Sequence, residues 1–252
     1  MKVRTGCNKI AVLAAAMLVL GSVTPALAFD ATAVLAEVDA RMAPASYEMY
    51  RKLINIEPDG KRKEFVLYTV KKGADKMVAL FLDPPSEKGR STLRLGENLW
   101  LYIPNVGKPI RITSLQSVVG GVFNNADILQ LDFSTEYTAN AAGEDSGQYV
   151  LDLKARGPAV AYDRLKLWVD KKTRTPLTIE AYAASGLLIK TLHYSNIKDF
   201  GNKIVRPAAL ETDSPLYKGY KSVMLFDGIR PREFADEVFT LDYLPRVGEL
   251  RQ

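Results

Sequence analysis

The chain has 252 residues, with 34 Lys and Arg against 29 Asp and Glu, one His and one Cys. Apolar residues make up 47% and charged residues 25%, which is typical of a globular protein. This composition excludes a disordered chain, a collagen-like chain and a disulfide-stapled scaffold. The length suits one large domain or two small ones.

The first 28 residues have the pattern of a cleaved secretory signal peptide. Three basic residues within the first nine precede an apolar stretch over residues 10–20, and residues 25–28 (PALA) provide an A-x-A cleavage site. The apolar stretch is shorter than the ~20 residues that span a bilayer. We therefore expect cleavage before Phe29, export of the protein, and a mature chain over residues 29–252.

The mature chain is nearly neutral and contains no cysteine. Cys7 precedes the apolar stretch, whereas a lipidated cysteine would follow it, so Cys7 is lost with the signal peptide. Removal of three basic residues and no acidic residue leaves a formal charge of +2. This charge gives no reason to expect nucleic acid as a partner. The core must also hold the exported protein together without disulfide bonds.

A helix is expected at the start of the mature chain, over residues 30–42. Asp30 can cap its first turn, apolar residues recur at helical spacing on one face, and Pro44 disfavours helix at the residue before it. Residues 115–131 depart from the strand pattern of the rest, with a short helix expected over 126–131, capped by Asn124 or Asn125. Residues 239–244 are ambiguous between helix and strand.

Alternating apolar and polar residues predict strands over most of the chain. About eleven are expected, joined mostly by short turns: residues 64–70, 76–82, 92–95, 98–103, 109–113, 148–155, 164–170, 177–182, 187–194, 203–212 and 222–226. Short strands with hairpin turns predict an antiparallel meander, and so large a sheet tends to curl or close. No linker or internal repeat divides the chain, so we predict one domain.

No residue pattern in the chain indicates catalysis or a metal site. The single histidine, His193, lies in a predicted strand without a nucleophile or metal-ligand set beside it. Asp127, Asp132 and Glu136 are close in sequence, but nothing fixes them as a catalytic pair, and solvated loop acids explain them as well. We therefore expect no enzyme activity, no cofactor and no metal.

Several predicted strands are apolar on both faces. Residues 76–82 (KMVALFL) and 98–103 (NLWLYI) both lack the polar face that a half-solvated sheet requires. Either both faces are covered, with the N-terminal helix over a plain β core, or one face lines a cavity. A curled sheet with an unfilled interior can enclose an apolar ligand, which gains ~0.8 kcal/mol for each buried CH₂ group.

The region from residue 80 to 131 resembles the LolA-like superfamily of periplasmic outer-membrane lipoprotein-sorting proteins. The resemblance lies in residues 81–89 (FLDPPSEKG), 98–104 (NLWLYIP) and 108–112 (KPIRI), and residues 243–246 (YLPR) fit the usual C-terminal ending. It favours the broader lipoprotein-sorting branch over LolA itself. One departure follows residues 108–112, where that branch carries a Gly-Ser-Asp-Phe-like segment leading into an acidic residue. Gly121, Phe123 and Asp127 can be aligned with it, but the Ser-Asp pair is absent.

The resemblance implies a mainly β fold with a few helices, a half-open antiparallel β-barrel of about eleven strands with a helical lid. It implies a monomeric, chaperone-like carrier that shields acyl chains of a lipid or lipoprotein between the inner and outer membranes. Its partners would be an inner-membrane transporter of the ABC or RND type and an outer-membrane acceptor. No arginine that contacts acyl chains in LolA can be placed on this chain.

The expected site is an apolar lining with a lid. Trp100 and Tyr102, on one strand face, are the first candidates for the lining, because aromatic side chains bury much area. The other lining candidates are Phe65, Leu67, Phe81, Leu93, Ile112, Leu151, Leu153, Leu165, Leu167, Ile179, Leu192 and Phe226. The lid candidates are Val34, Leu35, Val38, Phe123 and Leu129, and Arg94 and Arg111 are candidates to meet a lipid head group or a partner.

Three alternatives to a lipid carrier stay open at this point. The same fold can carry another apolar ligand for an RND-type exporter. An envelope enzyme would need a polar cleft, with His193 beside Asp127 or Glu136. A non-catalytic interaction or scaffold protein would have a solid β core. An open apolar cavity, a polar cleft or a filled core would distinguish them.

Overall fold

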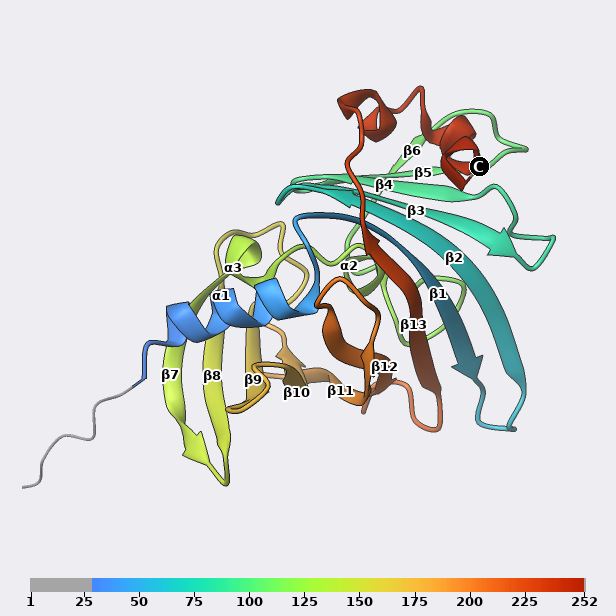
Figure 1. Cartoon of the computed structure of the whole chain (residues 1–252). Helices are drawn as coiled ribbons and strands as arrows, with labels where there is room; N and C mark the ends of the chain where they lie inside the picture. Colours follow the sequence, from blue (N-terminus) through green and yellow to red (C-terminus); the bar gives the residue numbers. More distant parts are fainter. Residues whose placement is uncertain (1–28, 252) are drawn as a thin grey trace, which may run out of the picture.

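The computed structural model describes residues 29–251, so the predicted signal peptide lies outside the described residues. These residues form one antiparallel sheet of 13 strands, not closed into a barrel, with a few helices (Figure 1). This confirms the mainly β, half-open architecture expected from the sequence. Within residues 29–251, no helix has the length and apolar character needed to cross a membrane.

The elements follow one another with short connections. The strands are β1 (Ser46–Ile56), β2 (Arg62–Lys72), β3 (Lys76–Asp83), β4 (Ser91–Leu95), β5 (Asn98–Tyr102), β6 (Ile110–Ile112), β7 (Tyr137–Asp145), β8 (Gln148–Ala155), β9 (Arg164–Asp170), β10 (Pro176–Tyr182), β11 (Leu188–Asp199), β12 (Val205–Asp213) and β13 (Lys221–Pro231). The helices are α1 (Ala31–Met42), α2 (Asn125–Ile128) and α3 (Phe133–Glu136), with the 3₁₀ helices η1 (Asp236–Phe239) and η2 (Leu244–Arg251) at the C-terminus.

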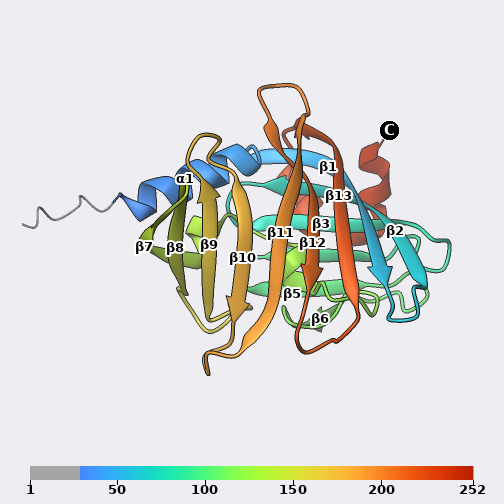
Figure 2. The ribbon, with the colours of Figure 1, turned by 90° about the horizontal axis from the view of Figure 1, so that it is seen from below.

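Two meanders make up the sheet. One runs from β1 to β6 and the other from β7 to β13, and they join where β13 pairs with β1, from Tyr47 opposite Pro231 to Ile56 opposite Lys221. The edge strands are therefore β6 and β7, which are consecutive in the chain but lie at opposite ends of the strand order. Figure 2 shows the sheet from below, with the strands β7 to β13 following one another beside β1 and β2.

The expected count of about eleven strands was wrong by two, since β1 and β7 were missed. The sequence of β1, SYEMYRKLINI, places charged residues at both parities and so hides its alternation. The sequence of β7, YTANAAGED, is rich in small and acidic residues with low strand propensity. Both strands form through pairing with neighbouring strands. Strand β1 pairs with β2 and with β13, and β7 pairs with β8.

The N-terminal helix forms as predicted. The Asp30 carboxylate accepts hydrogen bonds from the amides of Thr32 and Ala33 at 2.9 and 3.0 Å, which caps α1. The helix ends at Met42, where Ala43 is extended before Pro44. The short helix expected over residues 126–131 is α2, which ends three residues earlier. Its cap is Asn124, in a capping box with Asp127.

The C-terminal segment covers the outer face of β2–β5 and creates a second core. Residues 239–244, ambiguous from the sequence, run from the last residue of η1 to the first residue of η2, and Tyr243 and Leu244 among them pack on the sheet. Figure 1 shows this segment on the opposite side of the sheet from α1 and α2. Ser91 Oγ also donates to the Leu244 carbonyl at 3.1 Å. Both faces of these strands are therefore covered, which explains their doubly apolar sequences.

A buried carboxylate ties the chain leading to this segment to the sheet. Glu48 on β1 is buried and accepts hydrogen bonds from Tyr68 Oη at 2.5 Å and Arg232 Nη1 at 2.6 Å, and it also pairs with Arg230. Arg232 Nη1 additionally donates to the Leu250 carbonyl at 2.7 Å. Arg232 thus anchors the start of the C-terminal segment to Glu48 on the sheet and binds its end at Leu250.

The second core predicts a large effect for Leu244→Ala. Leu244 is fully buried, so the truncation leaves a cavity and should lower the free energy of unfolding by about 2–4 kcal/mol, as buried leucines typically do. Leu241→Ala, at a neighbouring exposed leucine, is the matched control and should change it by less than about 0.5 kcal/mol. Urea denaturation followed by circular dichroism measures both, and equal effects would contradict this account of the C-terminal segment.

Candidate functional site

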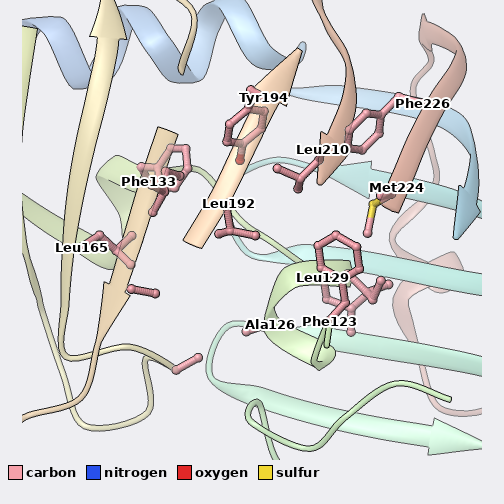
Figure 3. Close-up of a cluster of buried hydrophobic side chains, with 14 of the residues drawn as sticks. Phe123, Ala126, Leu129, Phe133, Leu165, Leu192, Tyr194, Leu210, Met224 and Phe226 are labelled. Atoms are coloured by element: carbon pink, nitrogen blue, oxygen red, sulfur yellow. The ribbon is translucent and has the colours of Figure 1, made fainter. Parts of the chain in front are cut away.

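The inner face of the curled sheet carries most of the predicted lining. One buried cluster contains Phe65, Leu67, Phe81, Leu151, Leu153, Leu165, Leu167, Ile179, Leu192 and Phe226, with Ile112 packed against it. The five lid candidates, Val34, Leu35, Val38, Phe123 and Leu129, belong to the same cluster. Figure 3 shows Phe123 and Leu129 among strand residues such as Leu192 and Met224. Contact of these residues with a ligand stays a prediction.

Three lining candidates lie on the wrong face for an inner cavity. Leu93, Trp100 and Tyr102 belong to the second core, under the C-terminal segment. The register explains the error, because Leu93 pairs with Trp100 while Arg94 pairs with Leu99. Leu99, which alternates with Trp100, belongs to the inner core instead. Alternation groups residues into faces but does not say which face is inner when both are apolar.

Residues 113–136, here called the crossing segment, connect the two edge strands through the inside of the sheet. They contain α2 and α3 and, apart from one isolated bridge between Ser117 and Asn124, form no strand. Their apolar side chains Phe123, Leu129 and Phe133 are part of the inner core. In Figure 1 the crossing segment and α1 lie together on the inner side of the sheet.

Two arginines of the sheet hold backbone carbonyls of the crossing segment. Arg51 Nη1 on β1 donates to the Ile128 carbonyl, and Arg94 Nη1 on β4 donates to the Leu129 carbonyl at 2.9 Å. Arg94 Nη2 also forms a buried ion pair with Glu136 Oε1 at 2.5 Å. Arg94 therefore does not face a head group or partner as expected, since its donors are used inside the protein.

The other predicted head-group candidate, Arg111, lies at the exposed surface. It stands opposite Trp100 in the register of β5 and β6, on the outer side of the sheet, and donates to the Asn98 side chain. A partner at the surface can reach it. Contact with a head group inside the curled sheet is ruled out by this position.

Asp127 is the centre of a buried polar network in the crossing segment. Its Oδ2 accepts from Lys190 Nζ on β11 at 2.8 Å and from the Asn124 amide at 2.9 Å, and its Oδ1 accepts from Tyr162 Oη at 2.8 Å. Lys190 Nζ also donates to the Val122 carbonyl at 2.6 Å. Burial, together with the negative charge of Asp127, raises the pKa of Tyr162 far above its usual value, so this phenol stays protonated and donates.

Two more contacts, an ion pair and a pair of hydrogen bonds to a carboxylate, fix the far end of the crossing segment. Lys71 Nζ on β2 pairs with Asp132 Oδ1 at 2.7 Å. Asp39 on α1 accepts from the amides of Phe133 and Ser134 at 2.7 and 2.9 Å, which joins the helix to the segment. Burial raises the pKa of Asp39 despite these hydrogen bonds. Helix and crossing segment therefore behave as one cover over the inner face.

The entrance of the crossing segment requires glycine at position 121. Asn55 Nδ2 donates to the Val119 carbonyl at 3.3 Å, and Ser222 Oγ accepts from the Val122 amide at 2.9 Å. A Cβ atom at Gly121 would lie 2.1 Å from Asn55 Oδ1. No side chain fits in that space unless Asn55 moves, so glycine allows the segment to lie directly on the sheet.

The interior of the structure is largely filled by side chains. A cavity of about 60 Å³ lies between the end of α1, the crossing segment and the strands, with Tyr47, Arg51, Tyr194, Arg206 and Phe226 in its wall. A second cavity of about 30 Å³ lies beside it, under Phe133 and Tyr162. At ~10–15 Å³ for each water-sized group, these spaces hold a few atoms and not a lipid chain. An acyl chain would have to displace the crossing segment.

The structure does not bring His193 together with Asp127 or Glu136. His193 is exposed on β11, whereas Asp127 is buried inside and Glu136 is paired with Arg94. The described part of the chain contains no cluster of three or more metal-ligating side chains. The polar cleft expected of an envelope enzyme, with His193 beside Asp127 or Glu136, is therefore not formed by these residues.

Sequence reasoning missed four of the five sheet cations that point inward: Arg51, Lys71, Lys190 and Arg206. A signal was present, because Arg51 has the apolar neighbours Met49 and Leu53 two positions away on each side, the pattern of an inward-facing strand residue. It was not used because β1 itself was not recognised. A cation at a strand position flanked by inward apolar residues indicates a buried polar partner.

Comparisons with known proteins find solved structures that share this fold. A family model described as "Uncharacterized protein" matches residues 73–246. A LolA superfamily protein from Nitrosomonas europaea is 28% identical, with a TM-score of 0.79 over 86% of this chain and 100% of that one. A putative outer membrane lipoprotein-sorting protein domain from Vibrio parahaemolyticus, 20% identical, has a TM-score of 0.73 over 86% and 98% of the two chains.

A DUF1329 family protein from Desulfovibrio piger also shares the fold, at 21% identity and a TM-score of 0.75 over 84% of this chain and 97% of that one. At this identity, as for the Vibrio domain, the likeness extends to the fold alone. No curated protein matches the sequence.

The Lys190–Asp127 pair predicts a large loss of stability for Lys190→Met. The variant leaves a buried carboxylate without its cation, which should cost about 3–5 kcal/mol in the free energy of unfolding. The double variant Lys190→Met, Asp127→Asn removes both charges and should recover part of that loss. Lys198→Met breaks the exposed Lys198–Asp227 pair and, as the control, should cost less than about 1 kcal/mol. Chemical denaturation tests this, and a double variant without recovery would contradict it.

Proposed function

Because the chain belongs to the LolA superfamily, we propose that it is a periplasmic carrier that shields lipid acyl chains inside its curled sheet. The cargo would be a lipid or a lipoprotein moving from the inner to the outer membrane. It would be received from an inner-membrane transporter of the ABC or RND type and delivered to an outer-membrane acceptor. The carrier would act as a monomer, without a cofactor and without catalysis.

One observation carries this proposal: the inner face is covered by a segment that no strand pairing fixes in place. The crossing segment rests on the sheet through apolar side chains and through hydrogen bonds from Arg51, Arg94 and Lys190. Side-chain contacts of this kind form and break without disturbing the ladder of the sheet. The crossing segment and α1 are therefore suited to serve as a lid.

The energetics of opening favour an apolar ligand. Lifting the lid exposes the leucine- and phenylalanine-rich inner face to water, at a cost of ~25 cal/mol for each Å² of apolar surface. An acyl chain that takes the place of the lid side chains buries the same surface again, at ~0.8 kcal/mol for each CH₂ group. The closed form is then the empty carrier, and cargo compensates for opening.

A filled interior is also what a scaffold protein with a solid core would have. The small cavities of the closed form agree with either function. A carrier for another apolar ligand of an RND-type exporter shares the same lid and differs only in cargo. These alternatives are separated by whether a ligand is bound and by its identity.

Native mass spectrometry of the mature protein tests the proposal. The protein is purified from periplasm without detergent, and bound molecules are extracted and identified. We expect a stoichiometric adduct of a lipid or acylated protein, or binding of added phospholipid and fatty acid where the cargo is released during purification. A bare protein mass together with no binding of any added lipid would overturn the carrier and favour the scaffold.

A lid variant predicts faster uptake. Arg94→Met with Glu136→Gln removes the hydrogen bond to the Leu129 carbonyl without leaving an unpaired buried charge. Loss of a few hydrogen bonds of ~0.5–1.5 kcal/mol each should raise hydrogen exchange in residues 122–131 about tenfold and speed the uptake of a fluorescent fatty acid.

The exposed Arg111→Met is the matched control for this variant and should change neither quantity. Unaltered exchange and uptake in the Arg94 variant, with the fold intact, would show that the crossing segment is not a lid held by this contact.

A further inference from the structure

Two of the inward-facing arginines differ from the other cations because no carboxylate balances them. Arg51 on β1 and Arg206 on β12 are each only 4% exposed. Lys71, Arg94 and Lys190 pair with Asp132, Glu136 and Asp127, whereas neither Arg51 nor Arg206 makes a salt bridge to any described residue. Unbalanced buried charge is unfavourable in a protein interior, so it points to a function.

The present partners of these two arginines are neutral. Arg51 Nη1 donates to the Ile128 carbonyl and lies 4.0 Å from Met224 Sδ. Arg206 donates through Nη1 to the Met42 carbonyl at 2.5 Å and through Nε to the Pro207 carbonyl at 3.2 Å. The Nε of Arg51 is buried and has no hydrogen-bond partner among residues 29–251. A donor is therefore free on one guanidinium.

Both guanidinium groups lie against one aromatic ring. Their central carbons are 5.8 Å (Arg51) and 4.6 Å (Arg206) from the centre of the Phe226 ring. Burial lowers the pKa of both, that of Arg206 to about 10, with the positive charge of Arg51 adding to the shift. At neutral pH both remain protonated and repel each other. An anion between them would relieve this repulsion.

The cavity that these arginines line suits a small anion. Its volume is about 60 Å³, room for roughly four water-sized groups. Tyr47 and Tyr194 lie in the same wall. Of the carboxylates there, Asp127 pairs with Lys190, Asp132 pairs with Lys71, and Asp39 accepts from two backbone amides, so none of them pairs with Arg51 or Arg206.

The pairing of β12 with β13 ends before it reaches Arg206. Pairing between β12 and β13 extends only from Asp213 opposite Lys221 to Ala209 opposite Leu225, so it stops short of Arg206. A wider cavity of about 360 Å³ shares Arg51 and Phe226 with the inner one, and outer-face residues such as Leu225 complete its wall. Arg51 therefore lines both the inner and the wider outer cavity.

We propose that Arg51 and Arg206 form an anion-binding site that receives the carboxylate or phosphate head of an amphipathic ligand whose apolar chain lies under the lid. The proposal rests on the proposed function and specifies its cargo as anionic. Guanidinium groups bind carboxylate and phosphate through paired, charge-assisted hydrogen bonds. Since Arg51 also holds the Ile128 carbonyl, an anion that competes for it would loosen the lid as the chain enters.

The test compares ligands that differ only in the head group. Calorimetric titration of the delipidated mature protein uses oleate, oleyl alcohol and lysophosphatidate below their aggregation concentrations, and inorganic phosphate separately. We expect oleate and lysophosphatidate to bind at least about tenfold more tightly than oleyl alcohol, the ratio that one charge-assisted hydrogen bond gives. Arg206→Gln should abolish this ratio, and the surface variant Arg111→Gln should preserve it.

The outcomes separate the two proposals. Equal affinity for oleate and oleyl alcohol would overturn the anion site and leave the carrier intact. Binding of neither, and of no other lipid, would overturn both. Binding of inorganic phosphate alone would retain the arginine site but overturn its assignment to a lipid head group. The comparison in the unaltered protein decides the matter even where Arg206→Gln fails to fold.

Discussion

The structure depends on one topological constraint, which is that consecutive strands β6 and β7 are the two edges of an open sheet. The residues between them, 113–136, must travel from one edge to the other, and they do so through the concave side. A buried segment with little regular structure carries backbone carbonyls that neither a helix nor a ladder satisfies. Inward-facing arginines and lysines of the sheet donate hydrogen bonds to these carbonyls. The interior is therefore polar at these positions.

This constraint joins stability to the proposed carrier function. The same contacts that satisfy the buried carbonyls are the contacts that hold the lid closed, so their strength sets how readily the inner face opens. Asp127, Asp132 and Glu136 neutralise three of the five cations in place. Arg51 and Arg206 are left with neutral partners, and their charge is available to a ligand.

The outer core shields a second apolar surface of the sheet from water. Strands β2–β5 are apolar on their outer side as well, and an uncovered apolar face of that size would promote association. The C-terminal 3₁₀ helices cover it, tied down by the buried pairing of Glu48 with Arg232 and by the bond from Ser91 to Leu244. The curled sheet thus presents its second apolar face only to the inside.

The sequence by itself determined the class of fold, eleven of the thirteen strands, the helix capped by Asp30, a short helix capped by Asn124 or Asn125, and the superfamily. Each rests on local signals: alternation, caps and turns, or motifs close together in the chain. Only the tertiary structure decided that Leu93, Trp100 and Tyr102 face outward and that Arg94 binds the crossing segment. It also decided that Arg51 and Arg206 both lie against the ring of Phe226. The reason is physical, because period-two alternation defines two faces without saying which one is inside. That choice, and the partner of a buried charge, depend on strands and segments that meet only when the chain folds.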